Sequence, residues 1–112
     1  MTIVPKYLSN SISGIPIVVG GTTINAGTLI HTAVNVANSM DNIHLTISNT
    51  ASTQQTCVLE WGSTGNQQMY TVSPSGVASV PFQFLSGGLS ISAFSQSASA
   101  LTISGRCYTE SP

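Results

Sequence analysis

Hydrophobic and polar residues alternate along much of the chain with a period of two, and a helical period of 3.6 is hard to find. Between residues 42 and 48, for example, Ile43, Leu45 and Ile47 alternate with His44 and Thr46. Gly, Asn, Ser and Pro separate such runs at intervals of roughly 8–12 residues, a spacing typical of β-sandwiches and barrels. The pattern predicts about eight strands, over residues 15–20, 28–36, 42–48, 56–61, 67–72, 77–84, 89–94 and 100–108.

The beginning of the chain lacks this alternation. Residues 1–14 contain Pro5, Gly14 and a cluster of Ser and Asn, and we predict an N-terminal arm that becomes ordered only when something binds it. The apolar residues of this arm, and hence its candidate contacts, are Ile3, Val4, Tyr7 and Leu8. Residues 15–112 contain no linker or internal repeat, so they predict a single all-β domain, an antiparallel β-sandwich of two packed sheets.

Two of the predicted strands carry the cysteines of the chain on their apolar faces. With a period of two, the residues expected to face the core on these strands are Cys57, Leu59, Trp61, Leu101, Ile103 and Cys107. The two cysteines either form an inter-sheet disulfide or remain free, buried thiols. The second interpretation is favoured because free Cys is among the most buried residue types.

Charged residues are unusually scarce. They make up 4% of the 112 residues, against roughly a quarter in ordinary globular domains. They are Lys6, Asp41, Glu60, Arg106 and Glu110. Two basic residues are too few to bind a nucleic acid backbone, and no apolar run approaches the roughly 20 residues that span a bilayer. With a net charge of −1 and a mean hydropathy of +0.28, the surface favours permanent association with partners.

Few residues of the chain offer catalytic or metal-binding chemistry. His31 and His44 have no carboxylate cluster near them in the sequence, so structural roles are favoured over a metal site or a general base. Asp41 precedes a predicted strand and is typical of a turn. Glu60 and Arg106 are expected on the outward faces of their strands and form a candidate surface ion pair, within one sheet or between subunits. The sequence predicts no catalytic site, metal site or cofactor.

Four segments resemble small head-decoration, or cement, proteins of tailed bacteriophages. They are GIPIVVGGTTINAGTLIHTA, DNIHLTISNTAS, CVLEWGS and VPFQFLSGGLSISAFSQSASALTISG. The resemblance extends from about Gly14 to Gly105, in short structural motifs. The chain departs from the family pattern in its closing segment, residues 106–112, and in the shortened, Gln-rich loop at residues 65–69.

The resemblance implies a jelly-roll β-sandwich and a non-enzymatic, structural role in the virion. Such a protein is expected to be a homotrimer on the outer surface of the capsid, where it binds neighbouring major capsid proteins and stabilises the shell. Assembly would take place in the reducing cytoplasm of the bacterial host, which agrees with two unpaired cysteines. A receptor- or glycan-binding module of a phage fibre is the alternative, because jelly rolls also host lectins. An enzyme is disfavoured by the shortage of charged residues.

Overall fold

The structure, a computed structural model, describes residues 2–22, 27–62, 66–97 and 99–112, and these residues form nine β-strands and no helix. The strands are β1 (Thr2–Lys6), β2 (Ile17–Val18), β3 (Thr28–Thr32), β4 (Met40–Asn49), β5 (Gln55–Trp61), β6 (Gln67–Val72), β7 (Val77–Leu85), β8 (Ser90–Ser95) and β9 (Leu101–Ser111). The described part of the chain therefore contains no helix that is long and apolar enough to cross a bilayer.

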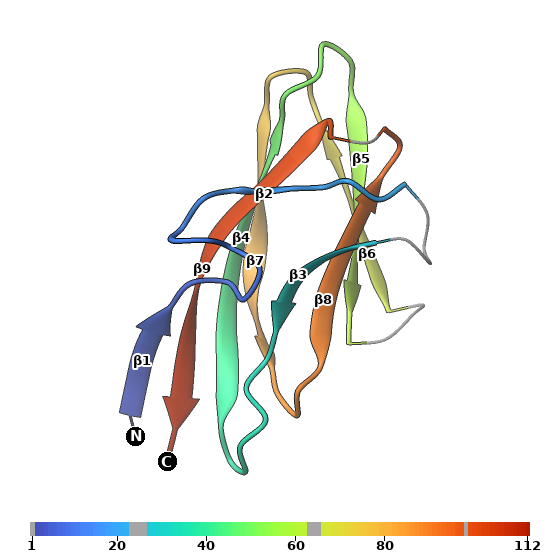
Figure 1. The fold of residues 1–112 in the computed structure, drawn as a ribbon. Coiled ribbons are helices and arrows are strands. Elements are labelled where there is room, and N and C mark those ends of the chain that lie inside the picture. The colour runs from blue at the N-terminus through green and yellow to red at the C-terminus, as the bar shows by residue number, and fades with distance from the viewer. Residues whose placement is uncertain (1, 23–26, 63–65, 98) are drawn as a thin grey trace.

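The strands form two antiparallel sheets that lie side by side in Figure 1. The first sheet has the order β1-β9-β4-β7, with β2 also paired to β9, and the second has the order β3-β8-β5-β6. All eight segments expected from the alternation contain a strand, although the first is reduced to the two residues of β2. The prediction of an all-β protein built from two antiparallel sheets is confirmed.

The core lies between the two sheets and is built from the inward-facing apolar side chains of strands in both sheets. In β4 the burial alternates along the whole strand, so that Ile43, Leu45 and Ile47 are buried and the residues between them are partly exposed. The buried cluster contains Leu8, Ile17, Val19, Ile30, Ile43, Leu45, Ile47, Cys57, Leu59, Trp61, Val72, Val80, Ile91, Ala93, Leu101, Ile103 and Cys107. All six residues that the alternation assigned to the core on β5 and β9 are among them.

An irregularity in β3 places a polar side chain, that of His31, within this core. The register of β3 against β8 shifts between Leu29 and His31, which is the mark of a β-bulge. As a result two consecutive residues, Ile30 and His31, are both buried. A regular strand would have turned His31 toward solvent.

The N-terminal residues differ from the expectation of an arm that needs a partner to become ordered. Residues 2–6 form β1, which pairs with the C-terminal half of β9, from Thr2 opposite Ser111 to Lys6 opposite Cys107. Leu8 is fully buried in the core. Pro5 is tolerated because β1 is an edge strand, where one side of the backbone needs no ladder partner. The prediction of an unstructured arm is therefore wrong, because pairing with β9 supplies the order that local pattern does not.

Candidate functional site

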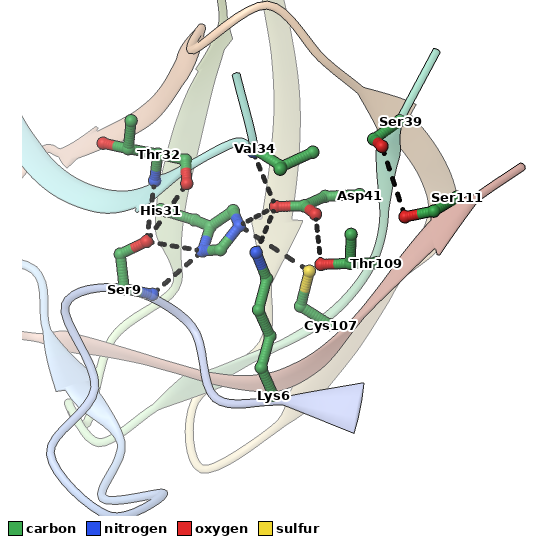
Figure 2. A network of polar contacts seen from close by, with 10 residues as sticks. All are labelled: Lys6, Ser9, His31, Thr32, Val34, Ser39, Asp41, Cys107, Thr109 and Ser111. Carbon is green, nitrogen blue, oxygen red and sulfur yellow. Dashed lines mark hydrogen bonds and ion pairs between the residues drawn. The ribbon is translucent and has the colours of Figure 1, made fainter. Parts of the chain in front are cut away.

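A cluster of polar side chains lies inside the sandwich, beneath the N-terminal segment (Figure 2). His31 from β3, Asp41 from β4 and Cys107 from β9 are all buried. The Nε2 atom of His31 lies 2.7 Å from Oδ2 of Asp41 and 3.6 Å from Sγ of Cys107. Lys6 of β1 reaches into the cluster, with its Nζ atom 2.9 Å from the same Asp41 oxygen. The cluster thus joins strands from both sheets.

The hydrogen bonds of His31 fix the tautomer of its ring. The backbone N–H of Ser9 donates to Nδ1 of His31 over 2.9 Å, so Nδ1 is an acceptor. The ring proton therefore resides on Nε2, which donates to the carboxylate of Asp41. The hydroxyl of Ser9 also lies 3.0 Å from Nδ1 and within 3.2 Å of the carbonyl oxygen of Thr32. Both ring nitrogens are occupied.

Asp41 is the anionic centre of the cluster. Burial by itself would raise the pKa of this carboxyl, but hydrogen bonds from His31, Lys6 and Thr109 and the positive charge of Lys6 outweigh burial and hold the pKa below its usual value. The Thr109 hydroxyl donates to Oδ1 over 2.8 Å, and the backbone N–H of Val34 donates to Oδ2 over 3.1 Å. Asp41 is therefore an ionised carboxylate with four donors around it, and the prediction of a turn residue is wrong.

The combination of Cys, His and Asp invites comparison with a nucleophilic triad, in which a histidine base sits between the thiol and the acid. Here both Asp41 and Cys107 approach the same nitrogen, Nε2, which already carries the proton. Burial, reinforced by the negative charge of Asp41, raises the pKa of the Cys107 thiol to about 12. A buried, protonated thiol is a poor nucleophile, so this arrangement is not suited to acyl transfer.

The same three side chains form the type of donor set that binds zinc. Their ligand atoms lie within 4.8 Å of one another, and His, Asp and Cys are all zinc ligands. A metal ion would need the lone pair of Nε2, whereas the Ser9 bond to Nδ1 leaves the proton on Nε2. A metal ion would also approach the ammonium of Lys6, which already neutralises Asp41. The contacts therefore favour a structural role, in which Lys6 serves as the internal cation.

That structural role is to fasten the N-terminal segment to the sandwich. Lys6 and Ser9 bond to Asp41 and His31, and the side-chain amide of Asn10 donates to the carbonyl oxygen of Leu29 over 2.6 Å. Figure 2 shows the segment passing across the cluster with Lys6 and Ser9 turned into it. Residues 6–10 are thus anchored by polar bonds as well as by the buried side chain of Leu8.

A second region of interest is the outer face of the first sheet. We use the name outer-face patch for His44, Phe82, Phe84, Arg106, Tyr108 and Glu110. The ring of His44 stacks on Phe82 with 5.6 Å between centroids, and Phe82 meets Phe84 edge to face at 5.8 Å. Tyr108 lies edge to face with His44 at 6.2 Å and carries the guanidinium of Arg106 at 5.9 Å from its ring centre. Phe82 and Phe84 are nevertheless 54% and 49% exposed.

The candidate pair of Glu60 and Arg106 is not formed within the chain. Glu60 lies on β5 of the second sheet, whereas Arg106 lies on β9 of the first. Glu60 is only 7% exposed, and its carboxylate lies 3.5 Å from the side-chain amide of Gln67 on the neighbouring strand β6. In the described part of the chain, Asp41 forms an ion pair with Lys6 and accepts a hydrogen bond from His31.

From the sequence, His31 and His44 are weighed together and Asp41 is interpreted as a turn residue, whereas the structure brings His31 and Asp41 together. His44 lies on the outer face of β4, on the opposite side of the sheet from His31. One signal was present in the sequence. The alternation of Ile43, Leu45 and Ile47, extended backward by one step, places Asp41 on the same inward face.

Both thiols are expected to resist labelling in the native protein. Cys57 and Cys107 are free and buried, and burial raises the pKa of Cys57 to about 12 as well. A thiol reagent at neutral pH should therefore modify neither residue until denaturant is added, and then both, without prior reduction. Mass spectrometry after labelling measures this. Two unmodified cysteines in denaturant without reductant would instead reveal a disulfide.

Comparison of the chain with protein-family models, with curated proteins and with solved structures finds no match in any of the three.

Proposed function

We propose that the protein is a non-enzymatic structural protein of a bacteriophage virion that decorates the outside of the capsid and stabilises it by binding the major capsid protein. Two grounds support the proposal: the resemblance of four sequence segments to decoration proteins, and the properties of the molecular surface. The observation that carries it is the distribution of exposed apolar side chains.

These side chains gather in the N-terminal part of the chain. Of the 14 large hydrophobic residues exposed in the described part of the chain, six belong to the first 18 residues. They are Ile3, Val4, Tyr7, Ile12, Ile15 and Val18. Ile3 and Val4 lie opposite Glu110 and Thr109 of β9, so the exposed side chains of β1 point to both faces of this edge strand and offer apolar contacts to a partner there. Leu8, which the sequence grouped with the contact residues, is buried and instead holds the segment in place.

The anchoring of this segment favours tight binding. Lys6, Ser9 and Leu8 are fixed in the sandwich, so the neighbouring Val4 and Tyr7 are presented on an ordered backbone. A surface that is already ordered loses less conformational entropy when it binds. If each contact with the capsid has only a modest affinity, several contacts made at once by linked copies would still give strong overall attachment.

The strand order supports the jelly-roll form of the sandwich. Strands β2, β9, β4 and β7 follow one another in the first sheet, and β3, β8, β5 and β6 in the second. Eight strands divided in this way, with the first beside the last, are expected of a double-sheet jelly roll. Jelly rolls are common in viral capsid proteins.

Replacement of exposed N-terminal side chains should weaken attachment to capsids. Val4 and Tyr7 are 51% and 62% exposed, so the double variant Val4→Ser, Tyr7→Ser should fold normally and lose roughly tenfold or more in capsid affinity, because interface anchors dominate binding. Co-sedimentation with undecorated heads measures this. Deletion of residues 2–13 is less informative, because it removes Leu8 and the partners of Asp41 and His31.

Val77→Ser is the matched control, because Val77 is 64% exposed on β7 at the other edge of the sheet. This variant should bind as the original chain does. Equal binding by the double variant and the control would remove the N-terminal segment from the contact. A complete lack of binding by the unmodified chain would exclude the decoration role.

One observation favours the alternative of a glycan-binding module. Phe82 and Phe84 expose their rings on a sheet face beside the polar groups of Arg106 and His44, and sugars commonly stack on such rings. A glycan array separates the two candidates. Specific binding that is lost in Phe82→Ser, together with no capsid binding, would support the glycan-binding role.

A further inference from the structure

The outer-face patch contains two charged side chains that form no ion pair with any residue that the structure describes. Of the five charged residues, Lys6 and Asp41 pair with each other. Glu60 is buried beside Gln67. Arg106 and Glu110 remain, and neither forms an ion pair with any residue that the structure describes.

Both residues lie on the same face of the same strand. Cys107 points into the core, so Arg106, Tyr108 and Glu110 point outward from β9 by the alternation of a strand. Glu110 lies four steps along the strand from Arg106, or about 13 Å at roughly 3.3 Å per residue. Tyr108 stands between them, with the guanidinium of Arg106 above its ring. The two oppositely charged residues therefore lie two positions before and two positions after Tyr108 on the same face of β9.

This order of charges is self-complementary. Consider a second copy whose outer-face patch lies against the patch of the first. The two-fold axis lies in the contact plane between the two copies and runs perpendicular to β9. The two β9 strands then run antiparallel, so Arg106 of each copy faces Glu110 of the other, and Tyr108 faces Tyr108. Such an isologous contact forms two symmetry-related ion pairs between Arg106 of one copy and Glu110 of the other. The arrangement agrees with sheet packing in general, because sheets that pack face to face keep their strands nearly aligned.

The apolar part of the patch fits the same arrangement. Asn42 pairs with Tyr108 on one side and with Phe84 on the other, so Phe84 lies level with the axis and would meet its counterpart in the second copy. The exposed rings of Phe82 and Phe84 would be covered. Aromatic side chains at the centre with charges farther out is the usual anatomy of a protein interface.

We propose that the outer-face patch is a two-fold contact between copies of this chain, with reciprocal Arg106–Glu110 ion pairs around a centre of Tyr108 and Phe84. The contact does not depend on capsid attachment, which is assigned to the N-terminal segment. It yields a dimer of twice the 11.6 kDa chain mass, or a pair of trimers if the trimer implied by the resemblance also forms through another surface.

Charge reversal tests the contact on the purified protein. Arg106→Glu and Glu110→Arg should each weaken the two-fold association about tenfold or more, because symmetry turns two attractive contacts into two repulsive ones. The double variant, Arg106→Glu with Glu110→Arg, keeps the net charge and should restore the association. Sedimentation velocity over low to high micromolar concentration measures the assembly, and circular dichroism verifies that each variant is folded.

Loss in both single variants and recovery in the double variant supports the proposal, whether the starting species is a dimer or a pair of trimers. A monomer at every concentration overturns it. So does a trimer, or a dimer that the single reversals leave unchanged or the double reversal fails to restore. Association of the purified chain is measured here, whereas the Val4 and Tyr7 test measures attachment to capsids, so failure of one proposal is distinguishable from failure of the other.

Discussion

Asp41→Ala is expected to destabilise the protein by about 3–5 kcal/mol, because several donors lose their acceptor and each unsatisfied buried polar group costs about 1–3 kcal/mol. Asp41 is fully buried and accepts hydrogen bonds from His31, Thr109 and the backbone of Val34 in addition to its contact with Lys6. Alanine would leave all these donors without their acceptor. Urea unfolding followed by circular dichroism measures the loss.

Lys6→Met is the informative comparison. The Lys6 side chain is 35% exposed, so its pair with Asp41 is screened by solvent and its removal should cost only about 1 kcal/mol or less. Asp41 would keep three of its donors. If Lys6→Met were as damaging as Asp41→Ala, the attraction between the two charges, and not the burial of an acceptor, would hold the cluster together.

The contribution of Asp41 should also depend on pH, in a direction that follows from its pKa. The folded-state pKa lies below the usual value, so the stabilisation is fully present above the unfolded pKa of about 3.9 and is lost as the pH falls through the folded pKa. The difference in unfolding free energy between the unmodified chain and Asp41→Asn should therefore be constant from pH 7 to about 5 and shrink below about pH 4. A difference that grew with acid would contradict an ionised Asp41.

Trp61→Ala should destabilise the sandwich by about 3–5 kcal/mol, as for other large aromatic residues removed from a core. Trp61 ends β5 and is packed in the buried cluster that both sheets share. Its backbone opposes Ile91 of β8, so the cavity would open between strands that have little freedom to close it. Thermal unfolding measures the change. An unaltered melting temperature with lost partner binding would instead identify Trp61 as a contact residue.

Trp61→Phe separates packing from hydrogen bonding. The indole Nε1 of Trp61 is buried and has no hydrogen-bond partner among the described residues, so phenylalanine removes an unsatisfied donor together with some volume. These effects oppose each other, and the variant should remain within about 1 kcal/mol of the original chain. A loss as large as that of alanine would show that the indole nitrogen makes a bond that matters.

The strands and the core residues could be predicted from the sequence, because the alternation of hydrophobic and polar residues is a local signal. The inward face of β4 is identified by the spacing of Ile43, Leu45 and Ile47 alone, without information from any other segment. The same rule assigned Cys57 and Cys107 to the interior. A two-residue period indicates which face of the sheet each side chain occupies. The pattern is clear because a buried sheet face accepts few polar residues.

The N-terminal strand was not accessible in this way. The side chains of Ile3 and Val4 are both exposed, so no alternation marks β1. Its order comes from pairing with β9 at the far end of the chain, where Thr2 opposes Ser111. A contact between residues so distant in sequence leaves no trace in a short window.

The polar cluster was missed for a related reason. Its partners lie far apart, with a sequence separation of 10 between Asp41 and His31 and of 68 between Asp41 and Thr109. An Asp before a strand usually makes a turn, and only donors arriving from three other segments make its burial favourable. Glu60 was misjudged because alternation gives the direction of a side chain but not what neighbouring strands place beside it.

The pairing of β1 with β9 has a consequence for chain connectivity. It brings the two ends of the chain to the same corner of the molecule, as Figure 1 shows. A peptide fused to either end would leave the sandwich from nearly the same point. A short linker could close the chain into a ring without crossing the fold, and the turn at residues 86–88, between β7 and β8, offers a place to reopen it. This topology therefore suits circular permutation.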